Sequence, residues 1–238
     1  MKKLFLATFL LSSLLVLSAG ATSHLSGKII ALDAGHGNEE TGAVNQRYGV
    51  IEAEVNWDVV VALESKLKAN GAQVVIAERL STRRDRVADA VEKCAQLDVN
   101  GDGVADNRKC DVLVSIHHNG NTDPEHDGTL VIYNEKKDIP LAEKLHDALL
   151  PLTGKDEGYL HGGYGMTVYK NLVSAITEAY YITNDAQAER YLFDLNADGV
   201  SNLVIEEADA QLQGLSDYFA GQSDGGSCSP GQAKQGKC

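Results

Sequence analysis

Short apolar runs alternate with helical patterns along most of this chain. The runs that predict buried strands are KIIAL at 28–32, AQVVIAE at 72–78, DVLVSIHHN at 111–119, TLVIYN at 129–134 and VSAITEAYYIT at 173–183. After the first run, apolar residues recur at helical spacing from Glu52, and Gly71 marks the end of that helix. A second helix is expected from about Thr82 and a last one from about Glu206 to Phe219. Such alternation favours an α/β fold, in which helices cover a largely parallel sheet.

The chain begins with a segment typical of a secretory signal peptide. Lys2 and Lys3 precede an apolar run that ends in small residues of the type that signal peptidases cut. We therefore expect a signal peptide at 1–21, one globular domain at 22–220 and a flexible Gly/Ser-rich tail at 221–238. An uncleaved membrane anchor is the alternative, but the apolar run is short for a membrane span. No later stretch predicts a transmembrane segment in the mature chain.

Charge and cysteine content narrow the partners and the compartment. The formal net charge is −13 at pH 7, which argues against a nucleic-acid partner. All four cysteines follow the expected signal peptide, and an oxidising compartment favours disulfides. Three pairings are formally open. Closure of short loops favours Cys94 with Cys110 and Cys228 with Cys238.

Side chains that can bind a metal stand where several predicted elements begin or end. In ALDAGHG, residues 31–37, His36 lies between two glycines in a turn that is expected at the end of the first strand. The candidates are His36, the Glu52/Glu54 pair, His117 and His118, and Glu178. Hydrolytic zinc sites use three side chains of this His and Glu mix and leave a fourth position to water. The residues alone leave structural roles open, because they are widely spaced and form no compact HExxH motif.

Two acidic loops predict a second kind of metal site. Each contains Asp-x-Asn-x-Asp-Gly, as calcium loops of the EF-hand type do. The calcium candidates are Asp98, Asn100, Asp102 and Asp106 in the first loop, and Asp194, Asn196 and Asp198 in the second. Position twelve is Lys109 in one loop and Ile205 in the other, where an EF-hand carries a glutamate. Solvated turns rich in Asp and Asn are therefore the alternative to calcium sites.

ALDAGHG, followed by IEAEVN, LVSIHHN and ITEAYYITN, resembles in order and spacing the zinc-dependent N-acetylmuramoyl-L-alanine amidases of the Amidase_3 family. The resemblance covers about residues 27–220. It implies a three-layer α/β/α sandwich with a central mixed, mostly parallel sheet of about six strands. It also implies hydrolysis of the amide between N-acetylmuramic acid and L-alanine in peptidoglycan.

The resemblance further implies roles for individual residues. The family's DPGHG histidine falls on His36, its helix-start glutamate on Glu52 and its SIHxN histidine on His117. These three residues would bind zinc. The family's catalytic glutamate falls on Glu178, which would activate water or pass a proton to the leaving amine. The sequence departs from the family at Ala34, where a proline is usual.

The neighbours of these residues have other expected roles. Glu54 and Glu52 point in different directions on a helix, so Glu54 is expected in solvent. His118 faces away from His117 on a strand, so it either supports the site from behind or lies at the surface. His161 lies in a Gly/Tyr-rich segment, residues 154–165, which reads as a mobile loop bordering a cleft.

The leading interpretation is an exported zinc amidase, periplasmic or secreted, that acts as a monomer on peptidoglycan or muropeptides. One alternative is a zinc peptidase that cuts within the stem peptide. Another is a catalytically silent, calcium-stabilised protein that binds the cell wall. The amidase and the peptidase differ in the mass of their products, and the silent protein would release none.

Overall fold

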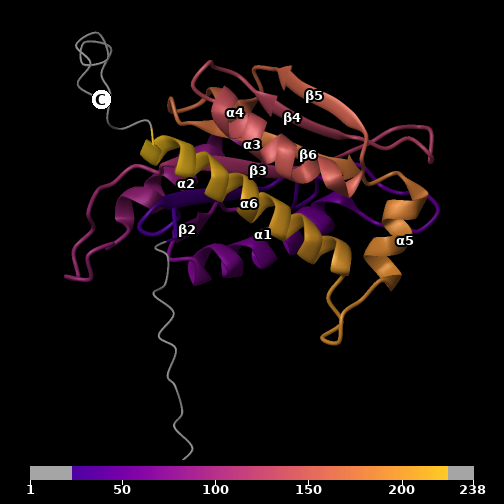
Figure 1. Ribbon diagram of the computed structural model, residues 1–238, viewed down its shortest axis with the longest axis horizontal. Helices are drawn as coiled ribbons and strands as arrows, with labels where there is room; N and C mark the ends of the chain where they lie inside the picture. Colours follow the sequence, from indigo (N-terminus) through magenta and orange to yellow (C-terminus); the bar gives the residue numbers. More distant parts are fainter. Residues whose placement is uncertain (1–22, 225–238) are drawn as a thin grey trace, which may run out of the picture.

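The computed structural model of the chain describes residues 23–224 (Figure 1). The expected signal peptide, most of the expected tail and the expected Cys228–Cys238 pair lie outside the described residues. Within the described part, no helix is long and apolar enough to span a bilayer. What is described is a layered domain built around one sheet.

Six strands form the sheet in the order β2-β1-β3-β6-β4-β5. Their bounds are β1 Ile29–Ala34, β2 Gln73–Ile76, β3 Val112–Asn119, β4 Thr129–Tyr133, β5 Asp156–His161 and β6 Ser174–Tyr181. β2, β1, β3 and β6 are parallel, whereas β4 pairs antiparallel with β6 and parallel with β5. The predicted mixed, mostly parallel sheet is confirmed.

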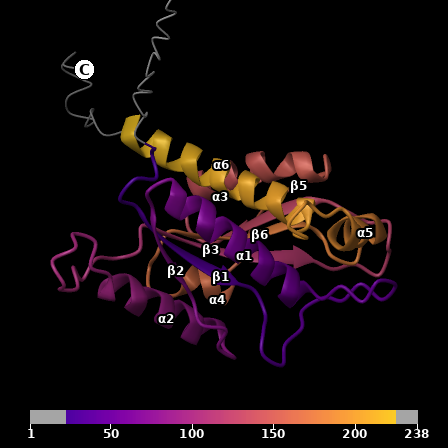
Figure 2. The same ribbon diagram turned by 90° about the horizontal axis from the view of Figure 1, so that it is seen from below.

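Helices cover both faces of this sheet (Figure 2). The helices are α1 Glu52–Ala69, α2 Arg83–Gln96, α3 Ile139–Leu149, α4 Gly165–Val168, α5 Asp185–Phe193 and α6 Asn202–Asp224, with a 3₁₀ turn at Leu150–Leu152. α1, α3 and α6 pack together on one face, and α2 and α4 lie on the other. The arrangement is the expected three-layer α/β/α sandwich.

The alternation of side chains along β1 explains why both faces are covered. Ile30 and Leu32 point into the apolar layer under α1, α3 and α6. Ile29 and Ala31 point into the opposite layer under α2. Because both sets are fully buried, β1 is an interior strand whose carboxyl end opens at the edge of the sheet between two helical layers.

Two sequence expectations differ from the structure. The segment expected as a mobile loop at 154–165 contains β5, an edge strand that pairs with β4. Because its side chains are mostly exposed, the sequence of β5 has no apolar strand pattern. Gly158, with a positive φ of 76°, further weakens the resemblance to a regular strand. The last helix begins at Asn202 rather than near Glu206, because Leu203 and Val204 already pack into the core.

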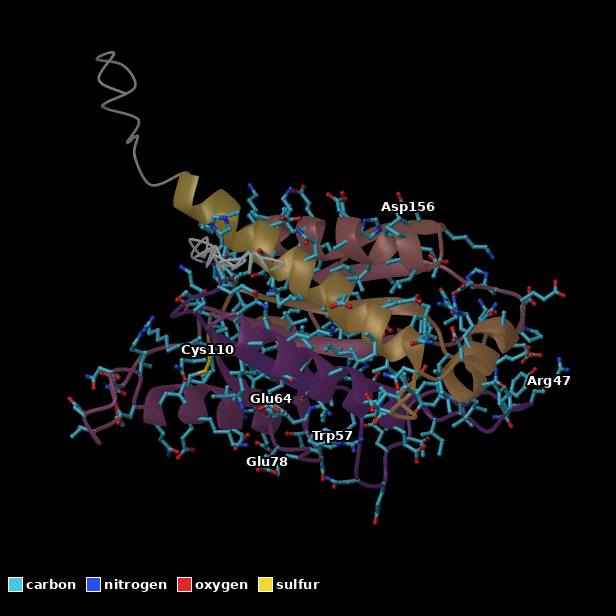
Figure 3. The ribbon with its side chains drawn as sticks, turned by 60° about the horizontal axis from the view of Figure 1, so that its bottom comes forward. Arg47, Trp57, Glu64, Glu78, Cys110 and Asp156 are labelled. Carbon is cyan, nitrogen blue, oxygen red and sulfur yellow. A yellow bond between two sulfur atoms is a disulfide. The ribbon has the colours of Figure 1, made fainter. Side chains whose placement is uncertain are left out.

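Cys94 and Cys110 form the disulfide expected from short loop closure, and Figure 3 shows it in yellow beside the label of Cys110. It joins the end of α2 to the start of β3 and encloses the first acidic loop. The disulfide holds the far end of α2, away from the helix start at Arg83.

Candidate functional site

The turn after β1 places His36 close to β3. Gly35 follows the strand, and a Cβ atom at this position would overlap the imidazole of His117. His36 itself has φ of 62°, a left-handed conformation that is uncommon outside glycine. The sequence DAGHG is therefore needed for close approach of two histidine rings, whose centroids are 4.8 Å apart.

Glu52 approaches the same point from the start of α1. The Ala43 N–H donates to its Oε2 at 2.8 Å, and the His118 N–H donates to its Oε1 at 3.2 Å. Gly42 lies against this carboxylate with no room for a Cβ atom. The backbone on both sides thus fixes the direction of Glu52, which is buried.

His36, Glu52 and His117 converge on one point. His36 Nε2 lies 3.2 Å from Glu52 Oε1, and His117 Nδ1 lies 3.1 Å from the same oxygen. One ligand atom from each residue falls within 4.8 Å of the other two. Among the described residues, these are the only three of His, Cys, Asp and Glu that come together in this way.

The electrostatics of the cluster follow from this shared oxygen. Burial alone would raise the pKa of Glu52, but hydrogen bonds from His117 and His36 outweigh it and hold the pKa well below its usual value. Burial lowers the pKa of His36, but the hydrogen bond to Glu52 and the charge of Glu52 outweigh burial, so the pKa is raised above its usual value. Glu52 is therefore a carboxylate with two imidazole nitrogens directed at it, a His₂Glu donor set of the kind that zinc hydrolases use.

Glu178 lies beside this set on the neighbouring strand. It is the register partner of His117 across the β3–β6 pair. Its Oε2 is buried and has no hydrogen-bond partner among the described residues. Burial, with a smaller contribution from the charge of Glu52, raises the pKa of Glu178 well above its usual value. A carboxyl group with a raised pKa is suited to acid–base chemistry.

These side chains line a cavity of about 390 Å³ that runs across the sheet face from β3 toward β5. Sequence reasoning placed His36, Glu52, His117 and Glu178 together, and all four line it. His118, expected either behind the site or at the surface, also lines the cavity, as do Leu160 and Tyr164 of the segment expected to border a cleft. The rest of the wall was missed and comprises Arg83, Asn119, Gly120, Leu130, Ile132 and Ile176. Most of these residues read as ordinary strand or helix positions, so only the fold brings them to the cavity.

A sequence profile of the Amidase_3 family, N-acetylmuramoyl-L-alanine amidase, matches residues 30–202. The chain belongs to this family. The match runs from the second residue of β1 to the first residue of α6, and it includes the other five strands completely.

Individual members and relatives are similar to the chain at about a quarter identity. LytC of Bacillus subtilis (strain 168), an N-acetylmuramoyl-L-alanine amidase, is 26% identical over 169 residues, which are 69% of this chain and 31% of LytC. YqiI of the same organism, described as uncharacterised, is 27% identical over 206 residues, 84% of this chain and 89% of YqiI. The chain thus spans about a third of LytC.

A solved structure agrees with the family. The catalytic domain of CwlV, an N-acetylmuramoyl-L-alanine amidase from Bacillus (Paenibacillus) polymyxa var. colistinus, superimposes with a TM-score of 0.65 at 26% identity. The match covers 81% of this chain and 98% of that domain.

A buried hydrogen-bond network of Asn56, His118 and Glu207 connects the site to α6. His118 Nδ1 lies 2.6 Å from Asn56 Oδ1, and His118 Nε2 lies 2.8 Å from Glu207 Oε2. His118 is therefore not a surface residue and supports the site from behind. Glu54 is exposed, as expected. His161 is exposed beside Tyr133 and does not line the cavity.

The two acidic loops lie at different ends of the molecule (Figure 1). In the first, the Asp98 carboxylate accepts N–H groups of its own loop, and Asp106 accepts those of Val99 and Asn100. In the second, Asn202 donates to Asp194. These bonds are those of Asp- and Asn-rich turns. Calcium binding by either loop stays a prediction.

A second, larger groove of about 650 Å³ lies between α1 and the α5–α6 segment. Trp57, labelled in Figure 3, lies on its wall together with Val61 and Val204. The described lining contains no histidine and a single carboxylate, so this groove offers no set of groups for hydrolysis. We assign the chemistry to the smaller cavity because the titratable cluster lies there.

Proposed function

We propose that this chain is an exported, zinc-dependent N-acetylmuramoyl-L-alanine amidase that hydrolyses the amide between N-acetylmuramic acid and the L-alanine of the peptidoglycan stem. The observation that carries the proposal is the convergence of His36, Glu52 and His117 within 4.8 Å, beside the unpartnered carboxyl of Glu178. Membership of the amidase family supports the choice of substrate.

The donor set fits zinc. His36, Glu52 and His117 would hold the ion, since two imidazoles and one carboxylate are the protein ligands of many hydrolytic zinc sites. When bound, zinc supplies Lewis-acid polarisation of the scissile carbonyl and lowers the pKa of a water molecule toward neutrality. The hydrogen bonds from Ala43 and His118 keep the Glu52 carboxylate oriented.

Glu178 would move the proton. In the ionised form its Oε2 takes a proton from the attacking water, and in the acid form it delivers that proton to the nitrogen of the leaving L-alanine. The raised pKa of Glu178 suits this role, because a carboxylate with a higher pKa is a stronger base toward the proton of the water. Leu130, Ile132 and Ile176 give this part of the cavity an apolar wall.

Export is supported by two features. The sequence at 1–21 has the pattern of a secretory signal peptide. The disulfide between Cys94 and Cys110 is of a kind that persists in oxidising compartments. Fractionation of cells that express the full chain should find the protein outside the cytoplasm and shortened at its amino terminus.

The activity is tested by digesting purified cell-wall sacculi. The wild-type enzyme should release stem peptides with a free L-alanine amino group, and removal of zinc should stop the release. Glu178→Gln should reduce kcat by roughly 10²- to 10⁴-fold while zinc content is unchanged. Glu54→Gln, an exposed change at the same helix start, is the control and should behave as wild type.

The products separate this proposal from its alternatives. Peptides cut between stem residues, with L-alanine still attached to the sugar, would identify a stem peptidase. Wall binding without any released product, in protein with zinc bound, would identify a catalytically silent binding protein. Either result would overturn the amidase proposal.

A further inference from the structure

Arg83 stands on the wall of the catalytic cavity with no partner of its own. It is exposed and lines the same cavity as Glu178 and Tyr164. Among the described residues it makes no ion pair and no side-chain hydrogen bond. Arg86, one helical turn later, differs because it pairs with the buried carboxylate of Asp33 at 2.9 Å.

The position of Arg83 is not explained by the stability of its helix. It is the first residue of α2, where the helix dipole disfavours a cation. Its side chain lies against Gly165 at the start of α4, and a Cβ atom at that glycine would overlap Arg83. The absence of a side chain at Gly165 thus leaves room for Arg83 where α4 approaches the cavity.

Arg83 is also the single Lys or Arg among the described residues of the cavity wall. It stands there in a chain with a formal net charge of −13. A guanidinium presents a planar pair of N–H donors that matches a carboxylate. An unpaired arginine at this place therefore indicates that the ligand of the cavity is an anion.

The chemistry of the proposed substrate limits where that anion can be. The lactyl carboxyl of N-acetylmuramic acid is consumed in the scissile amide, so the sugar side offers no carboxylate at this bond. On the peptide side, the second stem residue lies one Cα step of ~3.8 Å beyond L-alanine. A glutamate joined to the next residue through its side chain leaves its α-carboxylate free at this position.

We propose that Arg83 binds the free α-carboxylate of the second stem residue and makes the enzyme selective for stems that carry a carboxylate there over stems that carry a carboxamide. The inference rests on the proposed amidase function. Arg83 holds the substrate and takes no part in bond cleavage, so its contribution is to binding. A carboxamide cannot form the charge-assisted pair and presents its NH₂ group to a guanidinium that has only donors.

The test uses two N-acetylmuramoyl tripeptides that differ only at this group, one with the carboxylate and one with the carboxamide. The wild-type enzyme should favour the carboxylate by about tenfold in kcat/KM, the size expected for one hydrogen bond to a charged group. In Arg83→Gln this preference should disappear through a higher KM for the carboxylate substrate, with kcat unchanged. Arg83→Lys should retain part of the preference.

Arg84→Gln is the matched control, because Arg84 loses the same charge one residue away and lines a different cavity beside Tyr169. It should keep the full wild-type preference. Equal cleavage of both substrates by the wild type, or an unchanged preference in Arg83→Gln, would overturn the role of Arg83 while the amidase function stands. If the wild type cleaves neither compound and releases no stem peptide from sacculi, the proposed function itself fails.

Discussion

Glu52 depends on a buried hydrogen-bond network that extends from α1 to α6. Asn56, one turn further along α1, donates to the Gly35 carbonyl at 2.9 Å and accepts from His118 through its Oδ1. The other nitrogen of His118 faces Glu207, and both of these side chains are fully buried. The Glu207 carboxylate thus orients the His118 ring, and His118 in turn orients Asn56. Asn56 is bonded to the turn at Gly35, next to the proposed zinc ligand His36.

Glu207→Ala should therefore be costly. It leaves the buried His118 without its partner, and removing one member of a buried pair destabilises a protein by roughly 3–5 kcal/mol. We expect this loss in the free energy of unfolding measured with urea, together with a roughly 10- to 100-fold weaker zinc affinity. Glu206→Ala, at the exposed pair with Arg190, should cost about 1 kcal/mol or less. Equal losses in the two variants would contradict the role given to Glu207.

At the scale of elements, α2 is attached to the sheet by a buried ion pair. Asp33, in β1, lies 2.9 Å from Arg86 Nε through Oδ1 and accepts from Ser115 of β3 at 2.6 Å through Oδ2. Thr82 caps the same helix by accepting from the Asp85 N–H. These contacts set the position of the first turn of α2, and with it the position of Arg83 on the cavity wall.

Asp33→Ala should loosen this attachment. The change leaves the Arg86 charge buried without a carboxylate, so we expect a loss of roughly 3–5 kcal/mol in urea denaturation. Lys68→Ala, which removes the exposed pair with Glu64, should cost about 1 kcal/mol or less. If Asp33→Ala were no more destabilising than Lys68→Ala, the ion pair would not be what holds α2.

The same elements show what the sequence could reveal. The apolar runs were sufficient to predict the sheet. The grouping of His36, Glu52, His117 and Glu178 in one site came from the resemblance to the amidase family, because the residues alone left structural roles open. Arg83 could not be chosen over Arg84, since the two are neighbours in RRDR and only the packing of α4 separates their surroundings. The strand β5 was missed because it is an exposed edge strand that lacks an apolar pattern.

A signal for Glu207 was present in the sequence. It stands four residues after Leu203, on the apolar face of α6, where a carboxylate is expected only if it has a buried partner. The partner could not be named from the sequence, because His118 lies in a distant strand and the pair forms only when α6 packs over β3 and β6.

At the scale of the whole molecule, the three proposed zinc ligands belong to segments far apart in the sequence. His36 follows β1, Glu52 begins α1 and His117 lies in β3, so an ion held by all three would join them in the folded state. The unfolded chain has no such site, and zinc binding is therefore coupled to folding.

Zinc should raise the melting temperature of the metal-free protein. At zinc concentrations 100-fold above Kd the gain is about 2.7 kcal/mol, which corresponds to roughly 5 to 10 °C for a domain of this size. His36→Ala removes one ligand and should abolish most of the shift, whereas His161→Ala, at an exposed histidine outside the cavity, should retain it. Calorimetry of the three proteins with and without zinc measures this, and an equal shift in wild type and His36→Ala would place the ion elsewhere.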